Sequence, residues 1–293
     1  MDYQKAAQIL NAHIFDGDKR SLIQKVAEHP ERYVGLFRPT KPRAKLIQNL
    51  LQSHEIRFGD AIETLIREML KDMGYRVFSG DNLKLRWKGK DLSLDQFFCD
   101  REEKHFYFVE QKVRDDHDST KKRGQISNFE DKLEALYEKY GDKLVGVMYF
   151  IDPSLQKNKS YYVGELQEIG SLYEGAELYL FYGEEFFEHF GHSEMWDDLL
   201  GWLQRWREEI PELPEVNMDN NPGESFEELK DVEIKYWRKL VMNDDLWEKG
   251  IIQVLFPQGT TLKMVAQYFA KRETKPHKRL AELISEKMEE YYG

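Results

Sequence analysis

The chain has 293 residues, a formal net charge of −11 at pH 7, and contains 41% hydrophobic and 13% aromatic residues. That length and composition allow one large or two modest domains with a substantial core, and they exclude global disorder. The acidic balance argues against a protein that coats DNA indiscriminately, because such binding depends on phosphate neutralisation by Lys and Arg. An acidic net charge is still compatible with a local cationic cleft that binds DNA.

No run approaches the roughly eighteen continuous apolar residues that a membrane span needs, and the first ten residues lack the basic and apolar regions of a secretion signal. We therefore expect a soluble protein of the prokaryotic cytosol with no membrane partner. Cys99 is the single cysteine, so no internal disulfide can form. A buried, unreactive thiol is the favoured interpretation of Cys99.

Helical spacing over 3–28, broken by the Asp-Gly-Asp turn signal at 16–18, predicts two short helices. The next segment, 38–45, contains two prolines and no acid, which predicts an extended connector. Its four cations are Arg38, Lys41, Arg43 and Lys45. Two interpretations stay open: a solvated loop, or an arm that contacts DNA phosphates through Lys41 and Arg43.

A period near 3.6 predicts helix over 46–73, interrupted at Phe58–Gly59, with Asp60 capping the second half and Gly74 ending it. The period then changes, and the chain alternates between β-prone runs and turn signals. The predicted strands cover 75–78, 83–87, 92–98 and 105–109, with a hairpin connection at 100–104. A loop over 113–125 and a helix from Phe129 to Tyr140 follow.

The run 144–151 is the most hydrophobic in the chain, and predicts a strand covered on both faces. A further strand at 178–182 leads into a helix near 186–190. The order of strand, helix and strand predicts an α/β (α+β) fold: a central mixed sheet flanked by helices, with an N-terminal and a C-terminal helical region.

Beyond the sheet, an amphipathic helix is expected at 195–210, with Trp196, Leu199, Leu200, Leu203 and Trp206 on its apolar face. The segment 212–224 is the best linker candidate, and 226–292 reads as all helix, with a second basic patch at 271–279. We expect three regions: an N-terminal helical region at 1–56, a core with the central sheet at 57–210, and a C-terminal helical region at 211–293 for ligand binding or dimerisation.

The chemistry concentrates on Asp95, Glu110 and Lys112. Two carboxylates on adjacent antiparallel strands can meet at one end of a sheet, and Glu110 and Lys112, two apart on a strand, point the same way. Two carboxylates suit Mg²⁺, which polarises a phosphate and acidifies a bound water, while Lys112 can orient or deprotonate the nucleophile. The alternative is a cross-strand ion pair without catalytic function, contributing about 0.2–1 kcal/mol if exposed.

The segment after Lys112 mixes donors and acceptors densely, which a loop that only bound phosphate would not need. Base-edge readout uses both kinds, because Asp accepts from cytosine, Arg and Lys donate to guanine, and Gln pairs with adenine. The candidate DNA-contacting residues are Arg114, Asp115, Asp116, His117, Asp118, Ser119, Thr120, Lys121, Lys122, Arg123 and Gln125.

Asp95 and the Glu110-Gln111-Lys112 run, preceded by a helix that bears Glu63, resemble the PD-(D/E)XK nuclease superfamily, in particular its type II restriction endonucleases. The resemblance covers about residues 57–151, and it departs from the motif at Leu94, where the family often has Pro. It implies that Asp95 and Glu110 bind Mg²⁺, that Lys112 assists the attacking water, and that Glu63 completes the metal shell through a water. Asp60, one turn away, is the alternative to Glu63.

The same resemblance implies a restriction-endonuclease-like nuclease core at 57–210, sequence-specific cleavage of double-stranded DNA with 5′-phosphate and 3′-hydroxyl ends, a homodimer, and a cognate DNA methyltransferase in the same system. Two other functions stay open: a structure-directed or repair nuclease, and a non-catalytic DNA-binding regulator that uses the C-terminal helices. A glycosidase explains neither Lys112 nor the cationic loop. His117 lacks Cys or His partners nearby for a zinc site.

Overall fold

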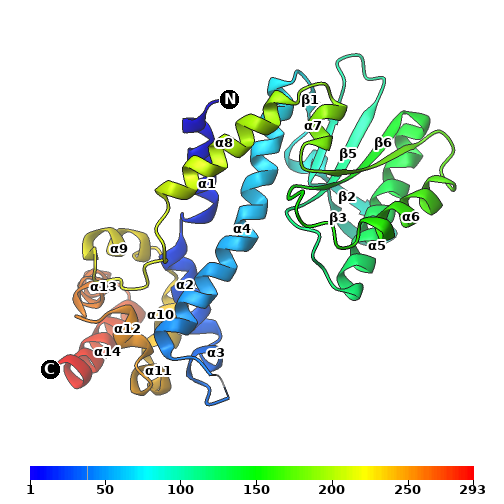
Figure 1. Ribbon diagram of the computed structural model, residues 1–293. Coiled ribbons are helices and arrows are strands. Elements are labelled where there is room, and N and C mark those ends of the chain that lie inside the picture. Colours follow the sequence, from blue (N-terminus) through cyan, green and yellow to red (C-terminus); the bar gives the residue numbers. More distant parts are fainter. Residues whose placement is uncertain (38) are drawn as a thin grey trace. The chain divides into compact units, whose positions relative to one another are not determined.

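The computed structural model describes residues 1–37 and 39–293. These residues form two compact units (Figure 1). The sheet unit consists of Met1–His13 and Phe58–Ile210, and the helical unit consists of Ile14–Arg57 and Pro211–Gly293. Both units are therefore built from two separate stretches of chain, and the division into three functional regions stays a prediction. No helix in the described ranges has the length and apolarity to cross a membrane.

The sheet unit contains a five-stranded mixed sheet, which confirms the expected fold class. Its strands are β1 (Arg76–Val77), β4 (Gln96–Cys99), β5 (Phe106–Lys112), β6 (Leu144–Phe150) and β7 (Glu177–Tyr182), in the order β1-β4-β5-β6-β7. The pairs β1–β4 and β4–β5 are antiparallel, while β5–β6 and β6–β7 are parallel. Every residue of β6 is buried, as its continuous hydrophobic run predicted. Cys99 is also buried, and burial raises the pKa of its thiol.

The expected single strand at 92–98 is in fact two strands in different sheets. The 3₁₀ turn Gly80–Leu83 leads into β2 (Lys84–Trp87), which pairs with β3 (Lys90–Ser93) as a separate hairpin, whereas β4 belongs to the main sheet. The chain changes sheets at Asp95, where the backbone bends and the Asp95 carboxylate accepts a hydrogen bond from Gln111 N at 2.8 Å. That side-chain bond replaces a ladder bond, which is why apolar patterning did not reveal the break.

Two helices, α5 (Ser119–Tyr140) and α6 (Lys159–Gly170), contribute to one core with the sheet. Phe129 of α5 packs against Phe108 with ring centroids 4.9 Å apart, and Met148 of β6 belongs to the same cluster. On β6 the next residue, Tyr149, instead stacks on Phe186 at 4.4 Å. Phe186 lies in α7 (Glu185–His189), so helices cover both faces of the sheet.

Helix α5 begins ten residues before the predicted start at Phe129. The carboxylate of Asp118 accepts hydrogen bonds from Thr120 N at 3.0 Å and Lys121 N at 2.9 Å, which is the pattern of an N-cap. The polar residues 119–125 are therefore the exposed first turns of a helix rather than a loop. The predicted end is confirmed, because α5 stops at Tyr140 and Gly141 follows with a positive φ of 57°.

The predicted interruption at Phe58–Gly59 is wrong: α4 runs unbroken over Pro42–Asp72. A helical Gly costs only about 1 kcal/mol relative to Ala. The buried residues that follow, Ala61, Ile62, Leu65, Ile66 and Met69, stabilise the helix by more than that. α4 begins at Pro42, a favoured first helical residue, so residues 42–45 of the predicted extended connector are helical, and Arg38 lies outside the described residues.

The two predicted N-terminal helices are confirmed as α1 (Tyr3–Ile14) and α2 (Asp18–Glu28). In the sheet unit, α8 (Glu194–Glu209) packs beside α1, since Trp206 Nε1 donates to Asn11 Oδ1 at 2.9 Å. The apolar face of α8 differs from the prediction: Trp202 is buried in it, whereas Leu200 is 46% exposed.

The helical unit confirms the all-helical prediction for 226–292. Its elements are α2, α3 (Glu31–Val34), α9 (Pro222–Leu229), α10 (Ile234–Val241), α11 (Asp244–Glu248), α12 (Ile251–Leu255), α13 (Thr260–Ala270), α14 (Lys275–Tyr292) and the first half of α4. The expected linker at 212–224 is not a free tether. Val216 and Met218 are buried in the core of this unit, and the buried carboxylate of Asp219 accepts from Gln258 N and Thr261 N at 2.8 and 2.7 Å.

Candidate active site

The antiparallel pairing of β4 with β5 brings Asp95 and Glu110 to the same end of the sheet. Gln96, the first residue of β4, pairs with Val109 of β5. Asp95 directly precedes Gln96 and Glu110 directly follows Val109, so the two carboxylates occupy the next position of the same register. Because β4 starts where β5 ends, the fourteen residues between the two carboxylates form the returning hairpin. The predicted meeting of the two carboxylates at one strand end is present in the structure.

Lys112 joins the two carboxylates. Its Nζ lies 3.0 Å from Asp95 Oδ2 and 2.7 Å from Glu110 Oε1, and it donates to Gln111 O at 2.8 Å. The Glu110 side chain is only 3% exposed, whereas that of Lys112 is 30% exposed. The cluster therefore contains a buried carboxylate, that of Glu110, whose partner Lys112 reaches solvent. The alternative interpretation was an exposed cross-strand ion pair.

Lys132 of α5 is a member of this cluster that sequence reasoning missed. Its buried ammonium forms an ion pair with Glu110 Oε2, and Asn128, one turn earlier, lies 3.4 Å from Glu110 Oε1 through Nδ2. Glu110 thus has one ammonium group at each oxygen. The available signal was positional, because Lys132 directly precedes Leu133 on the apolar side of α5, where a lysine needs a buried partner.

Burial and neighbouring charges act differently on the members of the cluster. Burial and the charge of Glu110 raise the pKa of Asp95. Burial also opposes the ionisation of Glu110, but the ammonium groups of Lys112 and Lys132 outweigh it and lower the pKa of Glu110. For Lys112, Glu110 and Asp95 outweigh burial and raise the pKa of the ammonium group. In this arrangement Lys112 is charged and donates hydrogen bonds to Asp95 and to the backbone carbonyl of Gln111.

Glu63 of α4 lies beside this cluster. Its backbone carbonyl accepts a hydrogen bond from Gln96 Nε2 at 2.7 Å, which ties this turn of α4 to the start of β4. Burial and the charge of Asp95 raise the pKa of the Glu63 carboxyl to about 7. Asp60 is exposed, whereas Glu63 is half-buried and close enough to Asp95 for their charges to interact. Between the two candidates, the electrostatics favour Glu63.

The donor set at this strand end fits a hard divalent cation. In the described ranges, no three His, Cys, Asp or Glu side chains converge closely enough to hold a metal ion by themselves. Mg²⁺ does not require three, because it keeps several waters and usually takes one or two carboxylates plus phosphate oxygens. Two buried polar atoms beside Asp95 have no hydrogen-bond partner in the structure: Gln96 Oε1, an acceptor, and Arg67 Nε, a donor. Both can form a hydrogen bond with water at the site.

Asp115 is not a DNA-reading residue in this structure, contrary to its inclusion among the DNA contacts. It is fully buried, and its carboxylate accepts from Asn158 N and Nδ2 at 2.8 Å each and from Tyr182 OH at 2.9 Å. These bonds fix the loop against α6 and β7. Asp118 is exposed but uses Oδ1 to cap α5. Within the loop 113–118, Asp115 and Asp118 therefore make structural contacts.

Other members of the predicted contact segment face solvent. Arg114, Asp116, Ser119, Thr120, Lys121 and Arg123 are exposed, and His117, Lys122 and Gln125 are half-buried. Lys122 lies over the ring of Tyr161 at 4.3 Å from its centroid, and Gln125 Oε1 accepts from Tyr162 OH at 2.5 Å. The start of α5 therefore presents cations on the helix that also carries Lys132.

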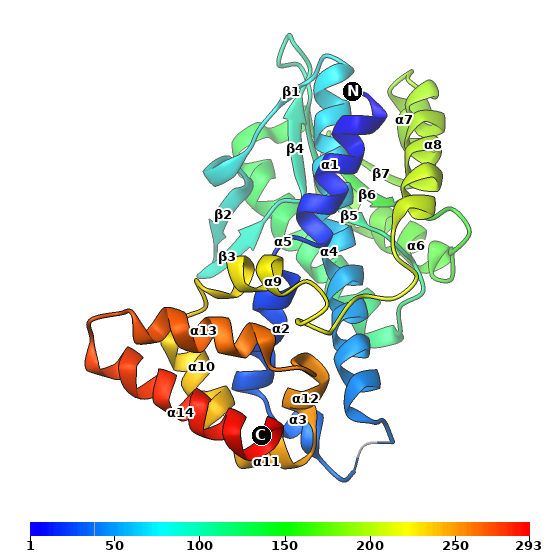
Figure 2. The ribbon, with the colours of Figure 1, turned by 90° about the vertical axis from the view of Figure 1, so that its left-hand side faces the viewer.

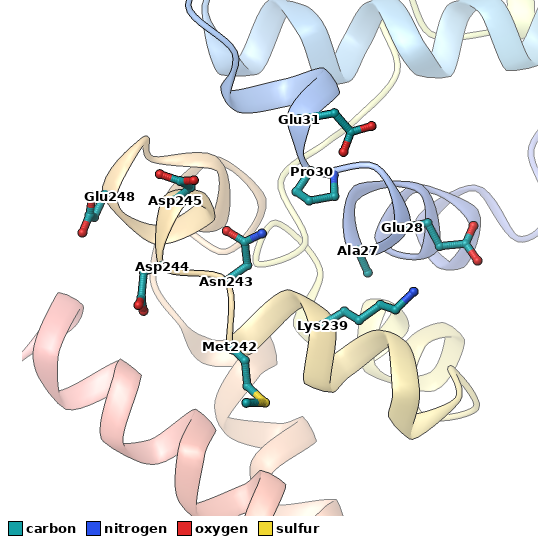
Figure 3. A pocket seen from close by; sticks show the side chains of 10 residues that line it. All are labelled: Ala27, Glu28, Pro30, Glu31, Lys239, Met242, Asn243, Asp244, Asp245 and Glu248. Carbon is teal, nitrogen blue, oxygen red and sulfur yellow. The ribbon is translucent and has the colours of Figure 1, made fainter.

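The remaining candidate contacts belong to the helical unit. Lys41 and Arg43 are exposed around the start of α4. The same unit has a hollow of about 730 Å³ between the ends of α2 and α10 (Figure 3). Its wall carries the carboxylates of Glu28, Glu31, Asp244, Asp245 and Glu248 and one ammonium group, that of Lys239. That charge repels phosphate, so this hollow is no part of a DNA interface.

Comparison with known families gives one match that covers most of the chain. A family model described as "Type II restriction endonuclease, HinfI" matches residues 2–86 and 81–207. The match includes Glu63, Asp95, Glu110, Lys112 and Lys132, and it ends before the C-terminal helices. No individually curated protein sequence matches the chain significantly.

Proposed function

We propose, from the premise that this chain belongs to the HinfI family of type II restriction endonucleases, that it hydrolyses double-stranded DNA at a specific sequence with Mg²⁺ as cofactor. We further propose that the sheet unit is a PD-(D/E)XK nuclease core. One observation carries the proposal: a single ammonium group, Lys112 Nζ, contacts Asp95 and Glu110 at 3.0 and 2.7 Å where β4 begins and β5 ends.

In this proposal Asp95 and Glu110 hold the metal directly, and Glu63 holds it through a water. Bound Mg²⁺ supplies positive charge that polarises the scissile phosphate and acidifies a coordinated water. Lys112, protonated and partly exposed, orients the attacking water and neutralises charge on the phosphate. Lys132 holds the second oxygen of Glu110 so that the first keeps its direction. The water oxygen would bond to phosphorus as the bond to the 3′ oxygen breaks, and one proton of that water would end on the 3′ oxygen, which leaves 5′-phosphate and 3′-hydroxyl ends.

For DNA contacts we propose the exposed residues between Arg114 and Arg123. Lys121, Lys122 and Arg123 at the start of α5 suit phosphate contacts, while Asp116 and His117 in the preceding loop suit base edges. Asp115 is withdrawn from this set, because reaching DNA would break the hydrogen bonds of its buried carboxylate to Asn158 and Tyr182. A contribution from Gln125, Lys41 and Arg43 stays a prediction.

We also propose a homodimer in which each subunit cuts one strand. The described residues provide one cluster of Asp95, Glu110 and Lys112 per chain, whereas a double-strand break requires two hydrolysed bonds. A cognate DNA methyltransferase that modifies the same sequence is the expected functional partner, since a site-specific nuclease would otherwise cut the DNA of its own cell.

The test is digestion of phage DNA by the full chain with and without Mg²⁺. Lys112→Ala and Asp95→Ala are expected to lower the cleavage rate by roughly 10²- to 10⁴-fold. A matched control is Lys104→Ala, which removes an exposed ammonium group at the opposite end of the same hairpin and should leave the rate unchanged. Calorimetric titration with Mg²⁺ and DNA should show weakened metal binding in Asp95→Ala.

Discrete fragments that disappear in both variants support sequence-specific cleavage, and sequencing their ends gives the target and the stagger. A smear would point to a structure-directed or repair nuclease instead. Binding of DNA with no cleavage under any metal would refute the enzymatic proposal.

A further inference from the structure

The last two helices of the helical unit, α13 and α14, form an antiparallel hairpin (Figure 2). A Cβ added to Gly259, just before α13, would lie 3.1 Å from Met288 Cε, near the end of α14. Near the opposite ends, the rings of Phe269 and His277 are 5.5 Å apart. The connecting residues therefore lie at the tip of a hairpin, which is not the crossed arrangement of a DNA-binding helix-turn-helix.

This tip carries a concentrated positive charge. The segment 271–279, called here the basic turn, contains five Lys or Arg residues and one carboxylate, on a chain whose net charge is −11. The cations are Lys271, Arg272, Lys275, Lys278 and Arg279, and all five are exposed. The family match ends at residue 207, so it assigns no role to them.

Most of these cations have no acidic partner. Arg279 is paired, with Glu282 at 3.0 Å and Glu286 at 3.3 Å. Arg272 lies over the ring of Tyr268 at 4.5 Å, a contact that leaves its charge uncompensated. Within residues 1–37 and 39–293, Lys271, Lys275 and Lys278 form no ion pair. Solvent and counterions alone neutralise them in the free protein.

A hollow of about 570 Å³ adjoins the basic turn and extends the same surface. It is lined by Arg272 and His277 on one side and by the start of α10 on the other. Two of its carboxylates already have cationic partners, because Glu233 pairs with Lys235 at 2.9 Å and Asp231 lies 3.9 Å from Arg20. Its third carboxylate is Glu273, its cations are Lys230, Lys271 and Arg272, and Lys230 pairs with Glu227 at 2.5 Å. This hollow therefore adds no excess of negative charge next to the basic turn, unlike the hollow in Figure 3.

We propose that the basic turn binds the phosphate backbone of the duplex DNA that the protein cuts. Four of the five residues of the basic turn that carry positive charge lack a carboxylate partner among the described residues, and lysine is a point charge that fits phosphate. Phosphate contacts carry no sequence information. It would therefore supply affinity without sequence preference, through release of counterions from the duplex. The inference rests on the proposed function, because it takes as partner the DNA on which that function acts.

The test measures binding of the full chain to a labelled duplex by fluorescence anisotropy, without divalent metal, at several KCl concentrations. The variant replaces Lys271, Arg272, Lys275 and Lys278 with Gln. We expect the slope of log affinity against log salt to become shallower by about three to four, since each phosphate contact contributes about 0.9. The affinity for a duplex with the cut sequence and for a scrambled duplex should fall by the same factor.

The matched control is Lys239→Gln with Lys249→Gln, two exposed lysines near the other end of the hairpin. There, Trp247 of α11 contacts Tyr291 of α14 at 5.1 Å. This control should keep the wild-type slope. Two double variants, Lys271→Gln with Arg272→Gln and Lys275→Gln with Lys278→Gln, should each remove about half of the effect, which guards against misfolding of the fourfold variant.

The outcomes separate the two proposals. If the wild type cuts DNA at discrete sites but every basic-turn variant keeps the wild-type slope, the inference is wrong and the proposed function stands. Loss of affinity for the cut sequence alone would also refute it, since that would mean base reading. If the wild type binds neither duplex, the inference is wrong, and the proposed function fails with it only if the protein also cuts no DNA in the presence of Mg²⁺.

Discussion

Charge is used in opposite ways in the cluster around Glu110 and in the basic turn. Glu110 and Lys132 are almost completely buried, and every charged oxygen of Glu110 faces an ammonium group. In the basic turn, Lys271, Lys275 and Lys278 are exposed and have no carboxylate partner within the described ranges. Burial requires pairing, because an isolated ion in a low dielectric is costly. Exposure allows charge to remain available for a partner.

The comparison separates two demands on a DNA-cutting protein. The side chains that take part in the reaction must keep a fixed orientation, so their charges are paired and shielded from water before the substrate binds. Groups that grip a polyanion must exchange counterions for phosphates, so they remain wet and uncompensated. Substitutions in the first set should therefore alter stability as well as activity, and those in the second set should alter binding alone.

The largest effect on stability is expected from Lys132→Met. It leaves Glu110 buried with one cation instead of two, and breaking a buried pair costs about 3–5 kcal/mol; the remaining Lys112 places the loss near 3 kcal/mol. Urea unfolding of the full chain measures it. Lys139→Met, on the same helix but exposed, is the control and should leave the unfolding midpoint unchanged.

A second substitution distinguishes pairing from packing in that result. Adding Glu110→Gln to Lys132→Met removes the uncompensated charge and should restore part of the lost stability. If the double variant is less stable than the single one, the ionised Glu110 is still stabilised by its remaining contact with Lys112, and an uncompensated charge does not explain the loss in Lys132→Met.

A smaller effect is expected within the loop before α5, where a buried and an exposed carboxylate are adjacent. Asp115→Ala removes the acceptor of Asn158 and Tyr182, and buried donors left without a partner cost about 1–3 kcal/mol. Asp116→Ala, one residue later and exposed, should not change stability. Thermal unfolding of both variants measures the difference; equal losses would mean that burial does not distinguish these two residues.

Much of the sheet and its site was predictable from local pattern. The apolar run at 144–151 and the aromatic run before Glu110 predict buried strands of a sheet, which β6 and β5 confirm. The two-residue period of a strand places Lys112 on the same side as Glu110. The errors occurred where side chains replace backbone partners. Asp95 bends the chain between two sheets, and Asp118 starts α5 early. Both depend on one polar contact that hydrophobic periodicity does not register.

Other features depend on contacts distant in sequence, which a single chain does not reveal. Lys132 is 22 residues from Glu110, and the pairing exists because α5 packs across β5. Asp115 resembled its acidic neighbours in sequence, yet it meets Asn158 43 residues away. The continuity of α4 through Gly59 likewise follows from packing, since a local penalty of about 1 kcal/mol is smaller than the burial on either side.

The smallest expected effect concerns the stability of the basic turn itself. In Lys275→Gln with Lys278→Gln, neither ammonium group loses a carboxylate partner, so the thermal midpoint should stay within error of the wild type while the salt slope of DNA binding becomes shallower. Differential scanning calorimetry without DNA measures it. A fall of more than about 2–4 °C, the shift for roughly 1 kcal/mol in units of this size, would mean that these lysines stabilise the hairpin. Their exposure would then reflect a structural contribution, and the contrast with Lys132 would no longer hold.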